Sequence, residues 1–220
     1  MEIKDLIDST LLRPEATRDE IVSLCEEALS YGFAAVCVNS CYAQTVGRLL
    51  AGSGVKTCVV VGFPLGAAAT EAKACEARYA LDVGTEEVDL VMNVGALKSG
   101  DPRGVQDDIR AVVEQCDGRA LVKVILECSL LSDGEKVEAC GLAVAAGADF
   151  VKTSTGFGSG SATAHDVKLM KEAVSGQARV KASGGIRDLA TAMEMVDAGA
   201  DRLGTSSGAY IVDEARRRGV

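Results

Sequence analysis

One short pattern recurs along this chain and constrains its fold more than any other feature. A glycine ends each predicted helix, and a short apolar strand begins within a few residues of it. Glycine suits this position because it adopts the left-handed conformation that closes a helix. Clear copies occupy residues 31–36, 83–88, 146–151 and 198–203. The repetition predicts strands and helices in alternation, as in α/β proteins with parallel sheets.

The alternation continues from end to end, with no long linker or low-complexity stretch. Eight units in one chain give about 27 residues per unit, which suits a compact βα repeat. We predict helices near 17–31, 42–51, 70–83, 103–116, 133–146, 163–175, 187–198 and 207–218. We predict strands near 6–10, 33–38, 56–62, 87–93, 120–126, 149–154, 178–183 and 201–205.

These elements favour an α/β fold with one domain over residues 1–220. We expect a closed (β/α)8 TIM barrel with a short extra helix or strand at the N-terminus. An open, doubly wound sheet is the alternative, because it uses the same alternation of elements. The hydrophobic fraction of 48% is sufficient for a large core.

Composition excludes several classes of function. The net charge of −9 disfavours nucleic-acid binding, which needs a basic surface. The N-terminus lacks the apolar core of a signal peptide, and no apolar run reaches the roughly 18 residues of a membrane span. We therefore expect a cytoplasmic protein whose eight cysteines are reduced. With one histidine and no Cys-x-x-Cys pair, a structural zinc site is disfavoured.

Three lysines lie within predicted strands: Lys123, Lys152 and Lys181. Lysine is rarely buried, because removing an ammonium from water is costly. Since strand side chains alternate between two faces, these lysines and Asp89 should all point into the barrel. They come from four neighbouring strands, and barrel enzymes do their chemistry at the C-terminal ends of such strands. The sequence therefore predicts an amine-rich active site.

A buried lysine beside another cation can become a neutral nucleophile, which attacks a carbonyl and forms a Schiff base. We assign Lys152 as this nucleophile because a hydroxyl-rich turn follows it. Lys181 is then the cation that lowers its pKa, Asp89 carries protons, and Lys123 tunes the electrostatics. The alternative is that the amines merely form ion pairs with Asp89 and Glu127.

The loops after the last two strands resemble anion sites. Glycines and backbone N–H groups at helix starts bind phosphate, and barrels often use these two loops for it. The candidates are Gly184, Gly185, Ser206 and Ser207, although the serines could simply cap a helix. Thr155, in the turn after Lys152, is a further candidate for substrate binding.

Several short segments are distinctive when taken in order. The most specific are residues 150–157 (FVKTSTGF) and 180–187 (VKASGGIR). Supporting segments are residues 87–93 (EVDLVMN), 62–66 (GFPLG) and 7–12 (IDSTLL). Together they resemble the deoxyribose-phosphate aldolases, a family of class I aldolases. Where the family often has a histidine before Thr-Leu-Leu, this chain has Ser9.

The resemblance implies a (β/α)8 lyase that reversibly cleaves 2-deoxy-D-ribose 5-phosphate to D-glyceraldehyde 3-phosphate and acetaldehyde. It implies no metal or organic cofactor, and we expect a homodimer with phosphorylated sugar and aldehyde substrates. Lys152 matches the Schiff-base lysine, Asp89 the proton carrier and Lys181 the residue that perturbs the pKa. The resemblance also places Asp8, Cys37 and Lys123 in the cavity, with Gly184, Gly185, Ser206 and Ser207 at the phosphate.

Other functions remain compatible with the residues alone. The same lysine could act in another Schiff-base-forming sugar-phosphate lyase, or it could hold pyridoxal phosphate. A barrel with these anion loops could also bind a sugar phosphate without turnover. A yellow protein would indicate pyridoxal phosphate, and tight binding unaffected by Lys152→Met would indicate a non-catalytic sensor.

Overall fold

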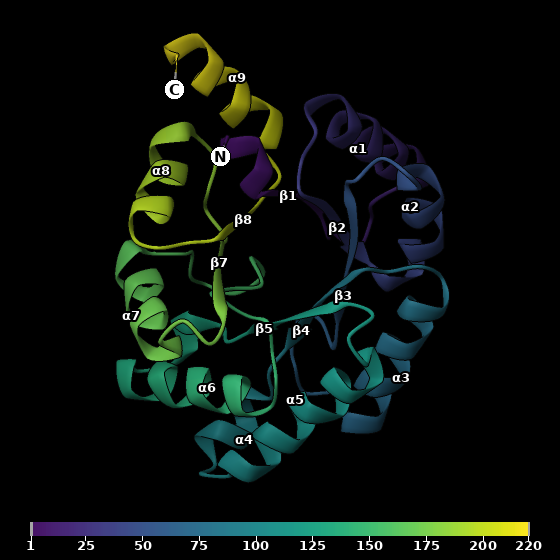
Figure 1. Ribbon diagram of the computed structural model, residues 1–220. Coiled ribbons are helices and arrows are strands. Elements are labelled where there is room, and N and C mark those ends of the chain that lie inside the picture. The colour runs from purple at the N-terminus through teal and green to yellow at the C-terminus, as the bar shows by residue number, and fades with distance from the viewer. Residues whose placement is uncertain (1, 220) are drawn as a thin grey trace.

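The chain forms a closed barrel of parallel strands in sequence order, as seen in the computed structural model, which describes residues 2–219 (Figure 1). The first and last strands pair with each other, which closes the sheet. This confirms the predicted (β/α)8 barrel and excludes an open sheet. The strands are β1 (Ile7–Leu11), β2 (Ala35–Asn39), β3 (Lys56–Val61), β4 (Glu87–Val91), β5 (Leu121–Ile125), β6 (Phe150–Lys152), β7 (Arg179–Ser183) and β8 (Arg202–Thr205).

Helices surround the strands as an outer ring (Figure 1). The α-helices are α1 (Arg18–Tyr31), α2 (Ala43–Leu50), α3 (Thr70–Asp82), α4 (Val94–Lys98), α5 (Pro102–Cys116), α6 (Asp133–Ala145), α7 (Ala164–Val174), α8 (Leu189–Asp197) and α9 (Gly208–Arg218). The 3-10 helices are η1 (Ile3–Leu6), η2 (Ser40–Tyr42) and η3 (Cys128–Leu130). Between residues 2 and 219, no helix is both long and apolar enough to cross a membrane.

Every predicted strand and helix begins and ends within two residues of the observed element. Local capping explains this agreement. Thr17 and Ser132 each accept a hydrogen bond from the backbone three residues later, and a glutamate at that position returns one, so a capping box fixes the start of the helix. Gly32 closes α1 in the left-handed conformation, with φ of 70°. The prediction missed α4, which is only five residues long.

The N-terminal 3-10 helix η1 corresponds to the short extra element expected before the first strand. The proposed domain of residues 1–220 includes Met1 and Val220, which lie outside the described residues, and its boundaries stay a prediction. Within residues 2–219, the large hydrophobic core lies between the barrel and its helices.

The barrel interior has two different halves. On the side of β2 and β3 it is apolar and contains Ala35, Cys37, Cys58 and Val60. On the side of β4 to β8, and at Asp8 on β1, buried charged residues take the place of apolar ones. The fold therefore places a charged cluster beneath the C-terminal ends of the strands.

Candidate active site

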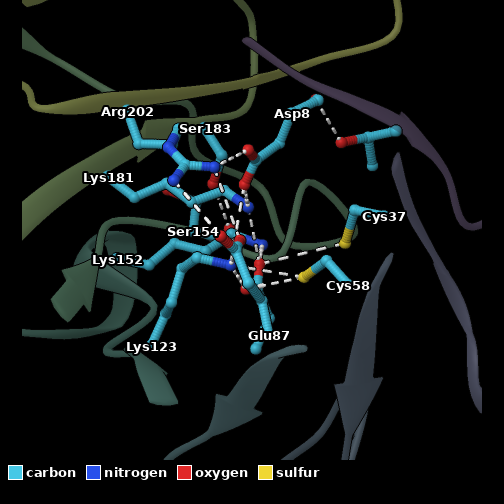
Figure 2. A network of polar contacts seen from close by, with 12 residues as sticks. Asp8, Cys37, Cys58, Glu87, Lys123, Lys152, Ser154, Lys181, Ser183 and Arg202 are labelled. Carbon is cyan, nitrogen blue, oxygen red and sulfur yellow. Dashed lines mark hydrogen bonds and ion pairs between the residues drawn. The ribbon is translucent and has the colours of Figure 1, made fainter. Parts of the chain in front are cut away.

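Asp89 lies at the centre of the charged cluster and is fully buried. Its Oδ2 accepts hydrogen bonds from Lys152 Nζ at 2.7 Å and from Lys181 Nζ at 2.8 Å. Its Oδ1 accepts one from Lys123 Nζ at 2.9 Å. Figure 2 shows the three lysines converging from their separate strands. The structure thus brings together the four residues that strand alternation directed inward.

The network extends toward the N-terminal end of the barrel through Arg202 and Glu87, which the sequence reasoning did not select, and through Asp8, which it did. Arg202 Nη1 donates to Asp8 Oδ1 at 2.6 Å, and Arg202 Nη2 donates to Glu87 Oε1 at 3.2 Å. Lys181 Nζ donates to Asp8 Oδ2 at 2.5 Å, and Lys123 Nζ lies 2.6 Å from Glu87 Oε2. Strand alternation could have found Glu87, which shares a face with Asp89.

The partners of each cation differ in number. Within 4.0 Å, Lys152 pairs with one carboxylate and Lys181 with two. Lys123 pairs with three and Arg202 with two. The cluster thus holds four cations, these three lysines and the arginine, against three carboxylates, which are those of Asp8, Glu87 and Asp89.

Burial and attraction act in opposite directions on the pKa values. Burial raises the pKa of Asp89, but the three surrounding lysines outweigh it and hold that pKa well below its usual value. The pKa of Asp8 is lowered in the same way by Lys181, Lys123 and Arg202. Burial lowers the pKa of Lys181, yet attraction to Asp8 and Asp89 raises it overall. Lys181 therefore stays an ammonium beside Lys152.

Two thiols border the cluster on its apolar side. Cys37 and Cys58 are partners in the register of β2 and β3, and their Sγ atoms lie 3.9 Å and 3.2 Å from the carboxylate of Asp89. A hydrogen bond from Cys58 lowers the pKa of Cys37, while burial raises that of Cys58. Sequence reasoning selected Cys37 but missed Cys58.

The two thiols and Asp89 are close enough to share a metal ion. However, Lys123 and Lys152 already occupy both oxygens of the carboxylate. A cation would have to displace these ammonium groups, so the surroundings favour amine chemistry at this position.

A pocket of about 240 Å³ opens above the cluster at the C-terminal ends of the strands. Lys152 is the only lysine lining it in the described part of the chain. Lys123 and Lys181 lie outside the lining, as do Asp8 and Cys37. The walls are Thr10, Leu12, Lys152, Thr155, Gly156, Phe157, Ser183, Gly184, Gly185, Ile186, Arg187, Gly204, Thr205 and Ser206.

A larger pocket of about 500 Å³ lies against η1, α8 and α9. Its walls are mostly apolar and include neither Lys152 nor any other member of the charged cluster. We therefore place the candidate site in the smaller pocket, because it is the one that reaches Lys152.

The glycine loop after β7 forms one end of the smaller pocket. Gly184 and Gly185 have φ values of +88° and +77°, and a Cβ at position 185 would lie 2.7 Å from Ser161 Oγ. Only glycine fits this conformation without strain. Arg187 also lines the pocket and is exposed. Sequence reasoning did not select it, although it ends the segment VKASGGIR.

The loop after β8 contributes less than expected. Ser206 lines the pocket, but Ser207 does not. The backbone N–H of Ser207 donates to Thr205 Oγ1 at 2.9 Å, and no side-chain bond caps α9 at Ser207. The structure therefore brings Gly184, Gly185 and Ser206 to the pocket and leaves Ser207 beside it.

The alternative in which the lysines form ion pairs with Glu127 is wrong. Glu127 Oε2 instead accepts hydrogen bonds from the backbone N–H of Thr155, at 3.2 Å, and from the Thr155 hydroxyl. Thr155 lines the pocket as predicted for a substrate-binding residue. Glu127 thus supports the pocket wall, while Asp89 is the carboxylate that pairs with the amines.

Comparison with known proteins gives a consistent result. Residues 6–212 match the family model of the DeoC/LacD family aldolases. The deoxyribose-phosphate aldolase of Clostridium tetani is 54% identical over 216 residues, covering 98% of this chain and 100% of that protein. Deoxyribose-phosphate aldolase 1 of Bacillus licheniformis is 56% identical over 211 residues, covering 96% and 95%.

A solved structure supports the same relationship. The tetrameric deoxyribose phosphate aldolase of Aeropyrum pernix superposes with a TM-score of 0.91 at 36% identity. The superposition covers 99% of this chain and 92% of that one. The likeness therefore includes the whole barrel and all the loops that form the pocket.

Proposed function

The chain belongs to the DeoC/LacD family of aldolases, and we propose that it reversibly cleaves 2-deoxy-D-ribose 5-phosphate through a Schiff base on Lys152. The products are D-glyceraldehyde 3-phosphate and acetaldehyde. The observation that carries this proposal is the placement of the amines. Three lysines surround Asp89, but only Lys152 also lines the pocket in the part of the chain described.

The ion pairs favour Lys152 for a second reason. A lysine must lose its proton before it can attack a carbonyl. Loss of that proton breaks one ion pair at Lys152, two at Lys181 and three at Lys123. Since the cluster has one cation more than it has carboxylates, a neutral Lys152 leaves the remaining charges balanced.

The reaction follows from this arrangement. The neutral amine of Lys152 adds to the C1 aldehyde to give a carbinolamine. Its hydroxyl takes up a proton, relayed from water, and leaves as water, which gives an iminium. A base then removes the proton of the C3 hydroxyl, the C2–C3 bond breaks, and its electrons move into an enamine. D-Glyceraldehyde 3-phosphate leaves, C2 takes up a proton, and water releases acetaldehyde from the amine.

Asp89 and Lys181 serve these proton transfers in different ways. The pKa of Asp89 lies well below its usual value, which makes its carboxylate a weak base on its own. We assign Asp89 to hold Lys152 and pass protons between the bound amines or a water. Lys181 remains charged on the same carboxylate oxygen, and Lys123 supports the opposite oxygen.

The phosphate of the substrate fits the far end of the pocket. Gly184 and Gly185 allow an anion to approach the backbone closely, and the loops there precede α8 and α9, whose N-termini attract negative charge. Ser206 and the exposed residue Arg187 line the same pocket. With its phosphate bound at the glycine loop, the carbon chain of the substrate would extend to Lys152 and place the aldehyde beside the amine.

Chemical trapping tests the proposal directly. Borohydride with acetaldehyde should add one ethyl group to the protein, and peptide mass spectrometry should place it on Lys152. Lys152→Met should remove both the adduct and the cleavage of the sugar phosphate. Lys123→Met is the matched control, since its amine lies outside the pocket and should leave trapping at Lys152 detectable. An intact wild-type protein without an adduct would refute the mechanism.

We propose a homodimer in the cytoplasm that acts on small phosphorylated sugars and aldehydes. All eight cysteines are free thiols, which supports a reducing compartment. The relative from Aeropyrum pernix is tetrameric, so light scattering coupled to gel filtration should distinguish the two assemblies. A tetramer in solution would overturn the homodimer.

A further inference from the structure

We propose that Glu127 is a positioning residue for this reaction, acting through Thr155 on the wall of the pocket beside Lys152. The inference rests on the proposed function of Lys152. Glu127 lies after β5, forms no salt bridge within residues 2–219 and is only 5% exposed. Its role is therefore to be sought in its hydrogen bonds.

Those bonds form a short chain from β5 to the turn after β6. Both donors of Thr155, its backbone N–H and its hydroxyl, point to Oε2 of Glu127. The Thr155 hydroxyl oxygen in turn accepts from the backbone N–H of Phe157 at 3.0 Å. The carboxylate oxygen of Glu127 thus restrains Thr155 directly and Phe157 through Thr155.

The backbone places Glu127 next to the reactive strand. The amides on either side of it continue the pairing of β5 with β6: Leu126 N–H donates to the carbonyl of Lys152, and Cys128 N–H to that of Thr153, both at 2.9 Å. Glu127 itself adopts φ of +58°, a left-handed conformation uncommon outside glycine. The two backbone hydrogen bonds that flank Glu127 therefore fix its position relative to Lys152 and Thr153.

Residues 155–157 border a pocket on each of two sides. The substrate pocket and a second one, of about 140 Å³, share Thr155 and Phe157 as walls. A Cβ added at Gly156 would meet no neighbour within 4 Å, and Phe157 is 49% exposed. Phe157 packs edge-to-face on Phe63, with ring centres 5.2 Å apart. Hydrogen bonds to Glu127 therefore supply much of the restraint.

The other carboxylate oxygen separates positioning from proton transfer. Glu127 Oε1 is buried and has no hydrogen-bond partner among the described residues. In Glu127→Gln, the amide oxygen can replace Oε2 and accept both bonds from Thr155, while the NH2 group takes the place of Oε1. If Glu127 only positions the turn, Glu127→Gln should retain catalytic activity. If Glu127 exchanges a proton, Glu127→Gln should lose it.

The first experiment measures kcat and KM for cleavage of 2-deoxy-D-ribose 5-phosphate. Glu127→Ala should lower kcat/KM about 10- to 100-fold, because a misplaced wall costs up to that much. Glu127→Gln should stay within about threefold of wild type, the range expected when the hydrogen bonds are retained. Leu130→Ala is the control: Leu130 is 52% exposed and lines only the second pocket, so its kcat/KM should be unchanged.

A double-mutant cycle tests whether Glu127 acts through Thr155. Glu127→Ala with Thr155→Val should lose no more than the worse single variant, since the two residues share one interaction. Additive losses would overturn the proposal. Thr155→Ser keeps the hydroxyl and should retain activity that Thr155→Val loses. This second pair can refute the proposal even if Glu127→Ala fails to fold, because equal losses in Thr155→Ser and Thr155→Val would show that the hydroxyl plays no part.

Trapping with acetaldehyde keeps the two proposals separate. Glu127→Ala should still form the reduced ethyl adduct at Lys152 when acetaldehyde is saturating, because the amine itself is unchanged. A wild-type protein that neither forms the adduct nor cleaves the sugar phosphate refutes the proposed function. An active wild type with Glu127→Ala within threefold of it, or with Glu127→Gln as impaired as Glu127→Ala, refutes the positioning role alone.

Discussion

The buried charge cluster should respond unequally to the loss of a cation and the loss of a carboxylate. With four cations and three carboxylates, Lys123→Met leaves three of each. Asp89→Asn leaves four cations facing two carboxylates, and three lysines lose the partner that they share. We therefore expect Asp89→Asn to destabilise the protein more than Lys123→Met does.

The magnitude follows from burial. Lys123 is fully buried, with Glu87 at 2.6 Å and Asp89 at 2.9 Å. Removing one partner of a buried ion pair costs about 3–5 kcal/mol. We place Lys123→Met near the lower limit, about 3 kcal/mol, and Asp89→Asn at about 5 kcal/mol or more, on that same range. For a chain of this size, these costs correspond to falls in Tm of roughly 6–12 °C and 10–20 °C.

A surface pair supplies the control. Lys56 and Glu86 lie 2.7 Å apart, but their side chains are 47% and 44% exposed. Lys56→Met should therefore cost at most about 1 kcal/mol. Urea unfolding followed by circular dichroism at pH 7, together with calorimetry, measures all three variants. The reasoning fails if Lys123→Met is no more destabilising than Lys56→Met, or if Asp89→Asn is the milder of the two buried changes.

Three further outcomes can be checked. The pKa values of Asp8 and Asp89 are depressed in the folded protein. Their stabilising effect is therefore present above the unfolded pKa of about 4 and is lost as pH falls below it. Urea unfolding at a series of pH values should show this decline, and constant stability down to pH 3 would contradict it. Arg187→Gln should raise KM for the sugar phosphate about tenfold, because a charged hydrogen bond is lost. KM for unphosphorylated deoxyribose should stay unchanged. An equal rise in KM for both sugars would show that Arg187 does not bind the phosphate. Gly185→Ala should lower the free energy of unfolding by about 1–2 kcal/mol, because the added Cβ meets Ser161. The same variant should weaken inhibition by inorganic phosphate. Unfolding energies from calorimetry and inhibition constants that match wild type would show that the loop relaxes freely.

Local signals determined much of this fold. The helix boundaries follow from caps such as Ser132 and Gly32, which depend only on neighbouring residues. Strand alternation directed Asp89, Lys123, Lys152 and Lys181 into one interior, because successive side chains must point to opposite faces. Helix caps and strand alternation each depend on residues within two to four positions of one another, so both can be recognised from the sequence alone.

Depth within the barrel is not a local property. Lys152 pairs in register with Ile125 on β5, whereas Lys123 pairs with Phe150, so Lys123 lies one inward step deeper. That stagger leaves Lys152 lining the pocket and Lys123 beneath it. Strand register, which only the closed barrel sets, therefore separates Lys152 from Lys123. It does not separate Lys152 from Lys181, which pairs with it between β6 and β7.

The same reason explains the residues that the sequence analysis missed or misplaced. Arg202 on β8 reaches Asp8 on the neighbouring strand β1 and Glu87 across the barrel on β4. Glu127, in a left-handed backbone conformation, bonds to Thr155. Partners so far apart in sequence are decided by the positions of whole strands and loops. The chain by itself determined which side chains face inward, and the tertiary structure decided which of them meet, because contact across a barrel depends on its closure and stagger.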